Sequence, residues 1–266
     1  MKRSRIVLFV FAALSFTGLG PAFAADMPLK APPLPQPTWT GFYLGGTVGA
    51  AWGRSNADTA TVVVPGGEFD PATIATINAA GMQRVDSSGF TGGIEAGYNW
   101  QPFGNPLLLG IEADLEAFDL RGNATTGPVV VPGPDSFTIT SAVSTDWLAT
   151  VRGRLGYAAG NWLFYGTGGA AFSKVNANFS FFDSSLAITE NAATSNWKTG
   201  YTVGGGIEAK VYGPWSAKAE FLYVNLGSVS TSGVFGAGLL FFPQPFTHTL
   251  SLSADIVRVG LNYHFQ

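Results

Sequence analysis

The sequence predicts an all-β fold, an eight-stranded antiparallel up-and-down transmembrane β-barrel, on three observations. Only 12% of its 266 residues are charged, whereas 14% are aromatic and 35 are glycine; soluble domains usually carry about 25% charged residues. Apolar and polar side chains alternate with a period of two in eight segments, as they do along β-strands. No apolar run approaches the ~20 residues that a membrane-spanning helix needs, so the low charge indicates a membrane barrel.

The chain begins with the features of a secretory signal peptide, predicted to occupy residues 1–24. A basic start is followed by nine apolar residues, 6–14, and then by the small residues Ala22 and Ala24 of a signal-peptidase cleavage site. The next segment, 25–38, contains five prolines and is predicted to form an extended periplasmic tether. Residues 39–266 are predicted to be the outer-membrane β-barrel domain.

The clearest of the eight alternating segments is 107–117. Its odd positions are leucine, isoleucine and alanine, and its even positions include Glu112, Asp114 and Glu116. Because successive side chains of a strand point to opposite faces, one face is apolar and the other is acidic. Only 162–173 is ambiguous, since glycine and alanine occupy both of its faces. The predicted strands are 42–52, 90–100, 107–117, 147–157, 162–173, 201–211, 215–223 and 257–265.

A soluble periplasmic sandwich would also alternate, and two observations favour the barrel over it. The polar face of 107–117 is acidic while that of 147–157 carries Arg152 and Arg154, so neighbouring strands present complementary charges. Aromatic residues also gather at the predicted strand ends, as they do in the interfacial girdles of membrane barrels. These residues are Trp39, Trp52, Trp100, Trp147, Trp162, Trp197, Trp215 and Phe265.

The connections between strands predict the orientation. Short turns at 101–106, 158–161 and 212–214 alternate with connections of about 34, 22, 20 and 21 residues. Outer-membrane barrels have short periplasmic turns and long extracellular loops, so we expect the long connections to be acidic-to-neutral surface loops. Their charged residues are Arg54, Asp58, Glu68, Asp70, Arg84, Asp86, Arg121, Asp135, Asp183 and Glu190. The uncharged last loop, 230–248, is expected to extend the wall, to lie against lipid or to expose an apolar patch.

The inward-facing positions of the predicted strands carry six acids and six bases. An eight-stranded barrel is only wide enough for its own side chains, and an unpaired buried charge costs several kcal/mol. We therefore expect a salt-bridged plug, and the alternative is a narrow ion pathway lined by the same charges. The predicted lumen residues are Glu95, Glu112, Asp114, Glu116, Arg152, Arg154, Lys198, Glu208, Lys210, Lys218, Glu220 and Arg258.

Composition argues against catalysis, cofactors and nucleic acid. The chain has no cysteine and only two histidines, His248 and His264, so the sequence contains no metal-binding constellation, and we expect neither a cofactor nor an enzyme. The glycine-rich stretches lack the strand–helix context and the lysine of a phosphate-binding loop. A net charge of −3 and an isoelectric point near 5.3 offer no basic patch to nucleic acid.

Three motifs resemble those of the porin-family outer-membrane proteins of alphaproteobacteria, whose barrel is of the OmpA-like, opacity-protein type. They are WTGFYLGG at 39–46, GYNWQ at 97–101 and RVGLNYHF at 258–265. The last is similar to an outer-membrane assembly signal formed by Gly260, Tyr263 and Phe265, although this chain adds Gln266 after the final aromatic residue. The resemblance implies an abundant envelope protein with outer-membrane lipid and the barrel-assembly machinery as partners.

The sequence therefore predicts a structural or surface protein of the outer membrane that presents extracellular loops, which would be the place for any extracellular ligand. The alternative is a small porin-like diffusion channel for ions or small solutes. The balanced lumen charges favour the first, because a selective pore usually carries an excess of one sign.

Overall fold

The computed structural model describes residues 38–102, 104–131, 135–237 and 243–265. The predicted signal peptide, its cleavage residues Ala22 and Ala24, and all but the last residue of the predicted tether lie outside these residues. Gln266 does as well.

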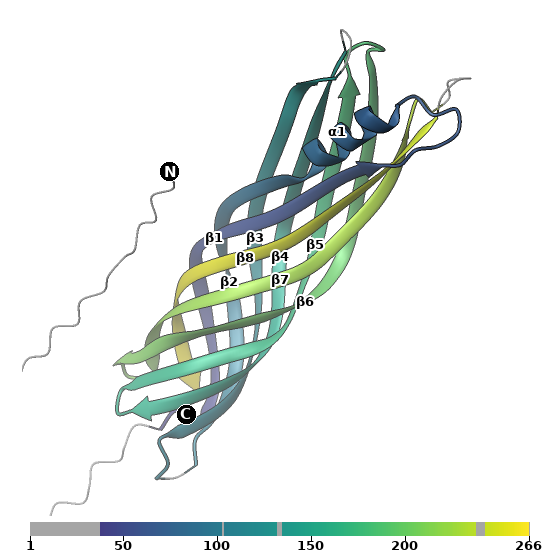
Figure 1. Ribbon diagram of the computed structural model, residues 1–266. Helices are drawn as coiled ribbons and strands as arrows, with labels where there is room; N and C mark the ends of the chain where they lie inside the picture. Colours follow the sequence, from purple (N-terminus) through teal and green to yellow (C-terminus); the bar gives the residue numbers. More distant parts are fainter. Residues whose placement is uncertain (1–37, 103, 132–134, 238–242, 266) are drawn as a thin grey trace, which may run out of the picture. The chain divides into compact units, whose positions relative to one another are not determined.

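Eight antiparallel strands pair in chain order, and the last closes on the first to form a barrel (Figure 1). The predicted fold class and strand number are confirmed. The strands are β1 (Gly41–Thr61), β2 (Gln83–Trp100), β3 (Leu107–Val130), β4 (Ser136–Ala159), β5 (Trp162–Asp183), β6 (Ile188–Tyr212), β7 (Trp215–Phe235) and β8 (Gln244–Phe265). One helix, α1 (Pro71–Gly81), lies in the connection between β1 and β2. Among the described residues, no helix is long and apolar enough to cross a bilayer.

The strands are about twice as long as the sequence predicts, and the prediction of four long loops is wrong. β3, for example, has 24 residues where 107–117 were expected. Of the connections at the end opposite the short turns, the one between β5 and β6 is reduced to 184–187, whereas the one between β1 and β2 is extended and contains α1. About ten residues suffice for a strand to span a membrane. The remaining residues of each strand therefore lie outside the bilayer.

The reason for the error is a change of polarity halfway along each strand. Outward positions of β3 are apolar from Leu107 to Ala117 and then become Asp119 and Arg121. Inward positions change in the opposite sense, from Glu116 to Phe118. Alternation thus continues beyond the membrane, but there the apolar residues face the inside, and an outward apolar row no longer marks the strand.

The same change divides the whole barrel. We call the part on the short-turn side the membrane half, and the rest the extracellular half. The last apolar outward residues of the membrane half are Trp52, Phe90, Ala117, Trp147, Phe172, Tyr201, Tyr223 and Val257. From these residues to the short turns the outward row spans 9–11 residues per strand, which matches a bilayer-spanning strand.

Side chains fill the barrel in layers. At the periplasmic end Trp39 is buried beside Leu108, Leu163 and Tyr165. The charged residues follow, and beyond them buried leucine, valine, alanine and phenylalanine side chains form a core like that of a soluble protein. At the extracellular end a second apolar cluster, which includes Phe137, contains four mutually packed aromatic rings. Those rings are Phe69, Phe181, Phe235 and Phe246. The interior is therefore occupied from one end to the other.

Two ladders end before the strands do. Pairing of β2 with β3 ends at Ser87 and Gly122, and pairing of β6 with β7 ends at Tyr201 and Asn225. Above these points β3–β6 form one sheet, and β7, β8, β1 and β2 form another. Figure 1 shows the extracellular ends of the two groups diverging, with α1 crossing between them.

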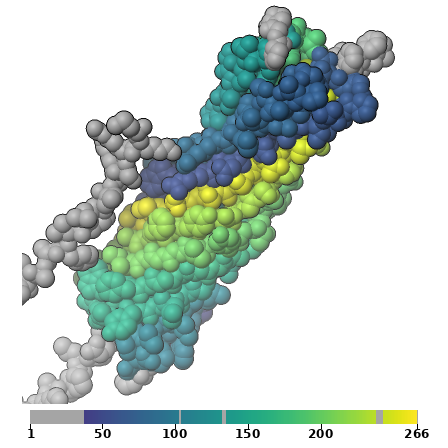
Figure 2. Space-filling model, in the orientation of Figure 1, coloured from purple at the N-terminus to yellow at the C-terminus, as the bar shows by residue number. Residues whose placement is uncertain are grey.

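The helix α1 is held by its cap and by one asparagine. Asp70 accepts hydrogen bonds from the Ala72 and Thr73 amides at 2.8 and 3.2 Å, and Pro71 starts the helix, as expected at an N-terminus. The Asn78 amide exchanges two hydrogen bonds with the Thr61 backbone. Figure 2 shows the blue segment that contains α1 lying between the teal strands and the purple and yellow strands.

Candidate functional site

Ten of the twelve predicted lumen charges meet inside the membrane half. Each is at most 5% exposed, and each makes at least one ion pair with another of the ten. We call them the lumen network. They are Glu95, Glu112, Asp114, Glu116, Arg152, Arg154, Glu208, Lys218, Glu220 and Arg258.

Cross-strand register brings the first contacts of this network together. Glu112 of β3 lies opposite Arg152 of β4 in the antiparallel ladder, and the two side chains form an ion pair. The same guanidinium lies 2.8 Å from Asp114 and reaches across the lumen to Glu220 at 3.1 Å. One arginine thus joins three carboxylates on two strands that are not neighbours.

Arg258 of β8 performs the same role from the other side of the barrel. Its guanidinium lies 2.5 Å from Glu220 and 3.3 Å from Asp114, and it also pairs with Glu116. Lys218 contacts Glu95 at 2.5 Å. These contacts cross the lumen in several directions, so the network fills its cross-section.

A second part of the network lies nearer the periplasmic end. Arg154 pairs with Glu208 and lies 3.6 Å from the centre of the Tyr165 ring. Glu208 also accepts the Ser216 hydroxyl at 2.5 Å and lies 3.2 Å from Nε2 of His264. The ion pair and the cation–π contact together hold the buried guanidinium of Arg154 in place.

The lumen network contains six acidic and four basic residues. The sequence predicted six of each, so the prediction of an equal number is wrong for this network. Uncharged hydroxyl groups stabilise the excess of two carboxylates by donating hydrogen bonds within the network. Hydroxyl groups donate to Glu112, Asp114, Glu116 and Glu220 at 2.5–3.0 Å. These hydroxyls belong to Tyr43, Thr47, Thr91, Thr150 and Tyr165.

Lys210 and Lys198 are the two predicted lumen charges that do not join the network. Lys210 lies at the periplasmic mouth, where its ammonium donates to the Thr38 carbonyl at 2.6 Å and sits 5.1 Å from the centre of the Trp39 ring. Lys198 lies in the extracellular half, on the part of β6 that has lost its pairing with β7. It makes no ion pair with any described residue. Both lysines occupy inward-facing positions of β6, as predicted. They lie outside the network because they are at other levels along the barrel axis.

A smaller polar group, which sequence reasoning missed, lies in the core of the extracellular half. His248 of β8 stacks on Phe179 at 4.8 Å and lies 3.2 Å from Glu190 of β6 and 2.9 Å from the Thr59 hydroxyl of β1. The sequence predicts Glu190 in a loop, whereas the structure places it on β6 with its side chain inward. The continued alternation of residues 188–200 was the signal that could have revealed it.

The extracellular tip carries two carboxyl groups whose pKa values depart from the ordinary range in opposite directions. Partial burial raises the pKa of Glu68, and the nearby carboxylates of Asp183 and Asp135 raise it further. The pKa of Asp70 is lowered, chiefly because the Thr73 hydroxyl donates to it and then because the Thr73 and Ala72 amides do. A carboxylate at a helix N-terminus is expected to behave in this way.

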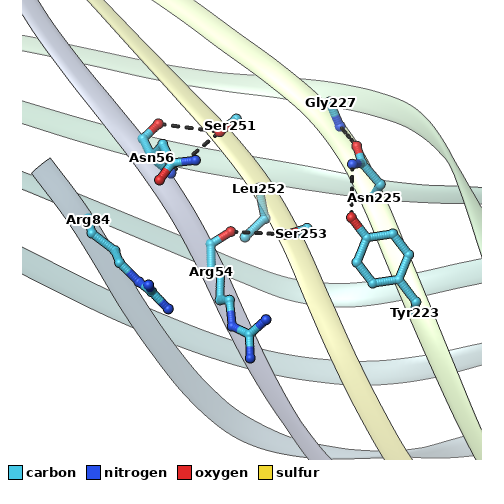
Figure 3. A pocket seen from close by; sticks show the side chains of 9 residues that line it. All are labelled: Arg54, Asn56, Arg84, Tyr223, Asn225, Gly227, Ser251, Leu252 and Ser253. Atoms are coloured by element: carbon cyan, nitrogen blue, oxygen red, sulfur yellow. Dashed lines mark hydrogen bonds between the residues drawn. The ribbon is translucent and has the colours of Figure 1, made fainter. Parts of the chain in front are cut away.

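On the outer surface, a polar groove of about 410 Å³ lies just above the apolar band (Figure 3). Arg54 and Arg84 line one side of it, and Tyr223 and Asn225 of β7 line the other. The Asn225 amide donates to the Tyr223 hydroxyl at 3.2 Å, and its oxygen accepts the Gly227 amide at 2.9 Å. The groove therefore borders the place where β7 leaves β6.

The proposed assembly-signal residues lie at the periplasmic end of β8. Tyr263 and Phe265 face outward in the apolar band and contact each other edge to face at 5.1 Å. Gly260 faces inward, where an added Cβ would lie 3.0 Å from the Gly46 carbonyl oxygen. A side chain at this position would therefore press tightly against the first strand.

Neither histidine belongs to a metal site in the part of the chain that is described, where no three histidine, aspartate or glutamate side chains are grouped to hold an ion. His264 lies in the periplasmic part of the lumen, with Nε2 2.9 Å from the Ser216 hydroxyl. His248 lies among aromatic rings in the extracellular half. The two sit in different layers of the barrel.

Comparison with known proteins agrees with this architecture. Residues 9–265 match the family model described as outer membrane protein beta-barrel domain. The 31 kDa outer-membrane immunogenic protein of Brucella melitensis biotype 1 is 32% identical over 98% of this chain and 99% of its own length. The 22 kDa outer membrane protein of Rhizobium leguminosarum bv. viciae is 27% identical over 79% of this chain and 76% of its own. Among solved structures, the outer membrane protease OmpT from Escherichia coli matches with a TM-score of 0.46 and 10% identity, covering 85% of this chain and 97% of that one.

Proposed function

The chain belongs to the outer membrane protein β-barrel family and resides in the outer membrane, and from this premise we propose that it is a closed surface protein and not a channel. The membrane half anchors the protein and seals its own lumen. The extracellular half then presents a rigid, polar surface to the outside of the cell. In this proposal the exposed surface is formed by the long strands and not by the long loops that the sequence predicted.

One observation carries the proposal. All ten charges of the lumen network are buried and joined across the barrel, so a permeating ion would have to separate pairs such as Arg152 and Asp114, 2.8 Å apart. Removing one partner of a buried ion pair costs about 3–5 kcal/mol. Above the network an apolar core follows, and a hydrated ion would have to cross it as well.

Single-channel recording in planar bilayers tests the proposal. We expect no stable, reproducible conductance step at moderate voltage from the full-length protein. A matched variant, Arg152→Ala with Arg258→Ala, provides a sensitivity control, because it removes the two side chains that join the carboxylates across the lumen. A reproducible open state of the unmodified protein would overturn the proposal.

A narrow cation pathway is the second candidate, and the excess of two acids over bases in the lumen network is the observation that favours it. It predicts that reversing the charge of Asp114 or Glu116 changes ion selectivity. If conductance is absent, or if both reversals leave it unchanged, this candidate is eliminated.

We assign the chain no catalytic step. The Ser216, His264 and Glu208 side chains are close together, but Nε2 of the histidine faces both the hydroxyl and the carboxylate. A Ser–His–acid arrangement needs the acid on the other ring nitrogen. All three are also buried at the base of the lumen network, away from lipid. An altered lipid profile in a His264→Ala strain would contradict this assignment.

We also propose outer-membrane lipid as the partner of the outward apolar band, and the barrel-assembly machinery as the partner of β8 through Gly260, Tyr263 and Phe265. Aromatic residues two apart at the end of the last strand support the second assignment, together with their outward direction. Slower membrane insertion of a Phe265→Ala variant would agree with it, and normal insertion would count against it.

A further inference from the structure

We propose that the extracellular half takes up an extended peptide segment of a partner protein as an added β-strand, between β6 and β7. This inference rests on the surface role proposed above and names the class of partner. The site consists of residues 188–200 of β6 and 226–235 of β7, which we call the open seam.

The two strands of the open seam each have a partner on one side only. Residues 188–200 of β6 pair with β5, from Ile188 opposite Asp183 to Gly200 opposite Ala171, and with no residue of β7. Residues 228–235 of β7 pair with β8 and not with β6. Unpaired strand edges are templates to which another strand can add.

A bulge in β7 explains why the ladder ends. The register of β7 against β8 shifts between Asn225 and Ser228, and Gly227 adopts a φ of 70°. The Asn225 side chain accepts the Gly227 amide at 2.9 Å and fixes this conformation. Because a bulge bends its strand, β7 turns away from β6 just above Gly200, where the two backbones are so close that a Cβ would lie 1.9 Å from the Asn225 carbonyl oxygen.

The other incomplete ladder of the barrel, between β2 and β3, is covered by a helix. There α1 covers the gap with Ile74 and Ile77, which are at most 5% exposed. Gln83 also bridges the two sheets by donating to the Thr126 hydroxyl and the Ile139 carbonyl, both at 2.9 Å. Covering an edge with a helix is one way in which proteins block unwanted pairing. No described element covers the open seam in this way.

The side chains of the open seam indicate the chemistry of its partner. The outward residues of its β6 edge are uncharged, and none is proline. They are Thr189, Asn191, Ala193, Ser195, Trp197 and Thr199. At the membrane-proximal end stands Lys198, partly exposed and without an ion pair among the described residues. We therefore expect an alternating segment that is uncharged except for one carboxylate, which meets Lys198.

The distal end of the seam limits how far a strand can enter. Glu190 reaches across it to His248 at 3.2 Å, and its carboxylate is so close to Gly233 that a Cβ there would lie 1.7 Å from Oε1. This bridge leaves residues 191–199 as the length available for pairing, which suits a strand of ordinary length.

A labelled synthetic peptide tests the proposal on the full-length protein in lipid vesicles. The probe is a peptide of about ten residues that alternates threonine and valine and carries aspartate near its amino end, so that antiparallel addition to β6 places the aspartate at Lys198. We expect saturable binding by fluorescence anisotropy. No binding up to about 1 mM peptide would overturn the proposal.

Two controls separate strand addition from other modes of binding. A peptide N-methylated at alternate residues lacks the N–H donors of one edge, so it should not bind; equal binding would exclude a backbone ladder. The Lys198→Glu variant should bind the aspartate peptide about tenfold more weakly and prefer a lysine peptide. Lys174→Glu on the outer face of β5 is the matched control and should bind normally.

A second copy of this chain is the competing occupant. The chain contains no cysteine, so a single Ser195→Cys variant reports directly on self-association. Formation of a disulfide-linked dimer in the membrane would assign the edge to a second copy and overturn the proposal, whereas an accessible thiol that the probe peptide protects would support it. Conductance measurements do not depend on the seam, so the closed-barrel function can fail or succeed separately.

Discussion

The two halves of this barrel share the same eight strands and have opposite polarity. In the membrane half, apolar side chains face lipid and ten charges face one another. In the extracellular half, Asp119 and Arg121 of β3 face water while Phe118 and Leu120 are buried. The solvent outside the wall decides which residues a strand can place on each face. A strand can therefore keep its alternation and still exchange its apolar and polar faces.

The two interiors should respond differently to the loss of one side chain, and the largest effect is expected in the membrane half. Replacing Arg258 with methionine leaves the buried Glu116 without a cation among the described residues and removes one of the two arginines that contact both Asp114 and Glu220. We therefore expect a loss of about 3–5 kcal/mol in the free energy of unfolding. Urea titration in vesicles, followed by the gel shift of heated against unheated protein, measures it. Arg121→Met removes an exposed arginine from β3 and should leave the midpoint unchanged. Equal effects of the two would show that the lumen network is hydrated.

The core of the extracellular half should behave like that of a soluble protein. Leu120 is 1% exposed and belongs to the apolar core above the network. Its replacement by alanine should leave a cavity and cost about 2–5 kcal/mol. Leu115→Ala on the same strand should cost less, because lipid can fill the space on the outer surface. Equal losses of stability from the two substitutions would contradict an apolar core inside the extracellular half and a lipid-facing position at Leu115.

Outward positions sharpen the boundary between the halves. Ile111 faces lipid near the middle of the β3 band, so Ile111→Arg should cost about 2–4 kcal/mol. Asn123 faces outward on the same strand in the extracellular half, and Asn123→Arg should have little effect on the same unfolding midpoint. If both arginines are tolerated, the apolar band does not contact hydrocarbon.

The smallest expected effect concerns α1, which only the extracellular half possesses. Because the pKa of Asp70 is lowered in the folded protein, the charged cap stabilises α1 above the ordinary range of aspartate, and this contribution is lost as pH falls through the lowered pKa. We expect the amide signals of Ala72 and Thr73 to shift with that transition in an NMR pH titration. Asp70→Asn keeps a capping oxygen and should abolish the transition; its persistence would place the titrating group elsewhere.

The membrane half could be predicted from sequence almost completely. A hydrocarbon exterior demands an apolar row on one face, so seven of the spanning segments were recognisable from their alternation. The eighth, 162–173, was expected as a strand but its faces were ambiguous, because glycine and alanine occupy both of them. The ion pair of Glu112 with Arg152 could be predicted because the two residues lie on neighbouring strands. Contacts that cross the lumen, such as that of Arg152 with Glu220, depend on how the barrel closes and could not be read from neighbouring strands.

The extracellular half was largely missed for a physical reason. Its inward residues include Ser55, Thr59 and Glu190 among the leucines and valines, so its apolar rows are interrupted and resemble loop sequences. Its seams depend on a bulge at Asn225–Ser228 and on the position of a helix. The bulge moves the buried side chains of β7 from even positions such as Leu226 to odd positions such as Val229, so a search for one continuous alternation loses the strand there. A search for alternation of either phase would have found the strand extensions.

The exchange of faces between the two halves can be measured on one strand. Single cysteines placed at the outward positions of β3, from Leu107 to Asn123, can carry an environment-sensitive fluorophore in vesicles that contain a lipid-borne quencher. An exchange of faces predicts quenching at every outward position up to Ala117 and a sharp loss of quenching from Asp119 onward. Quenching that continues through Arg121 and Asn123, or that is absent at Leu109 and Ile111, would contradict it.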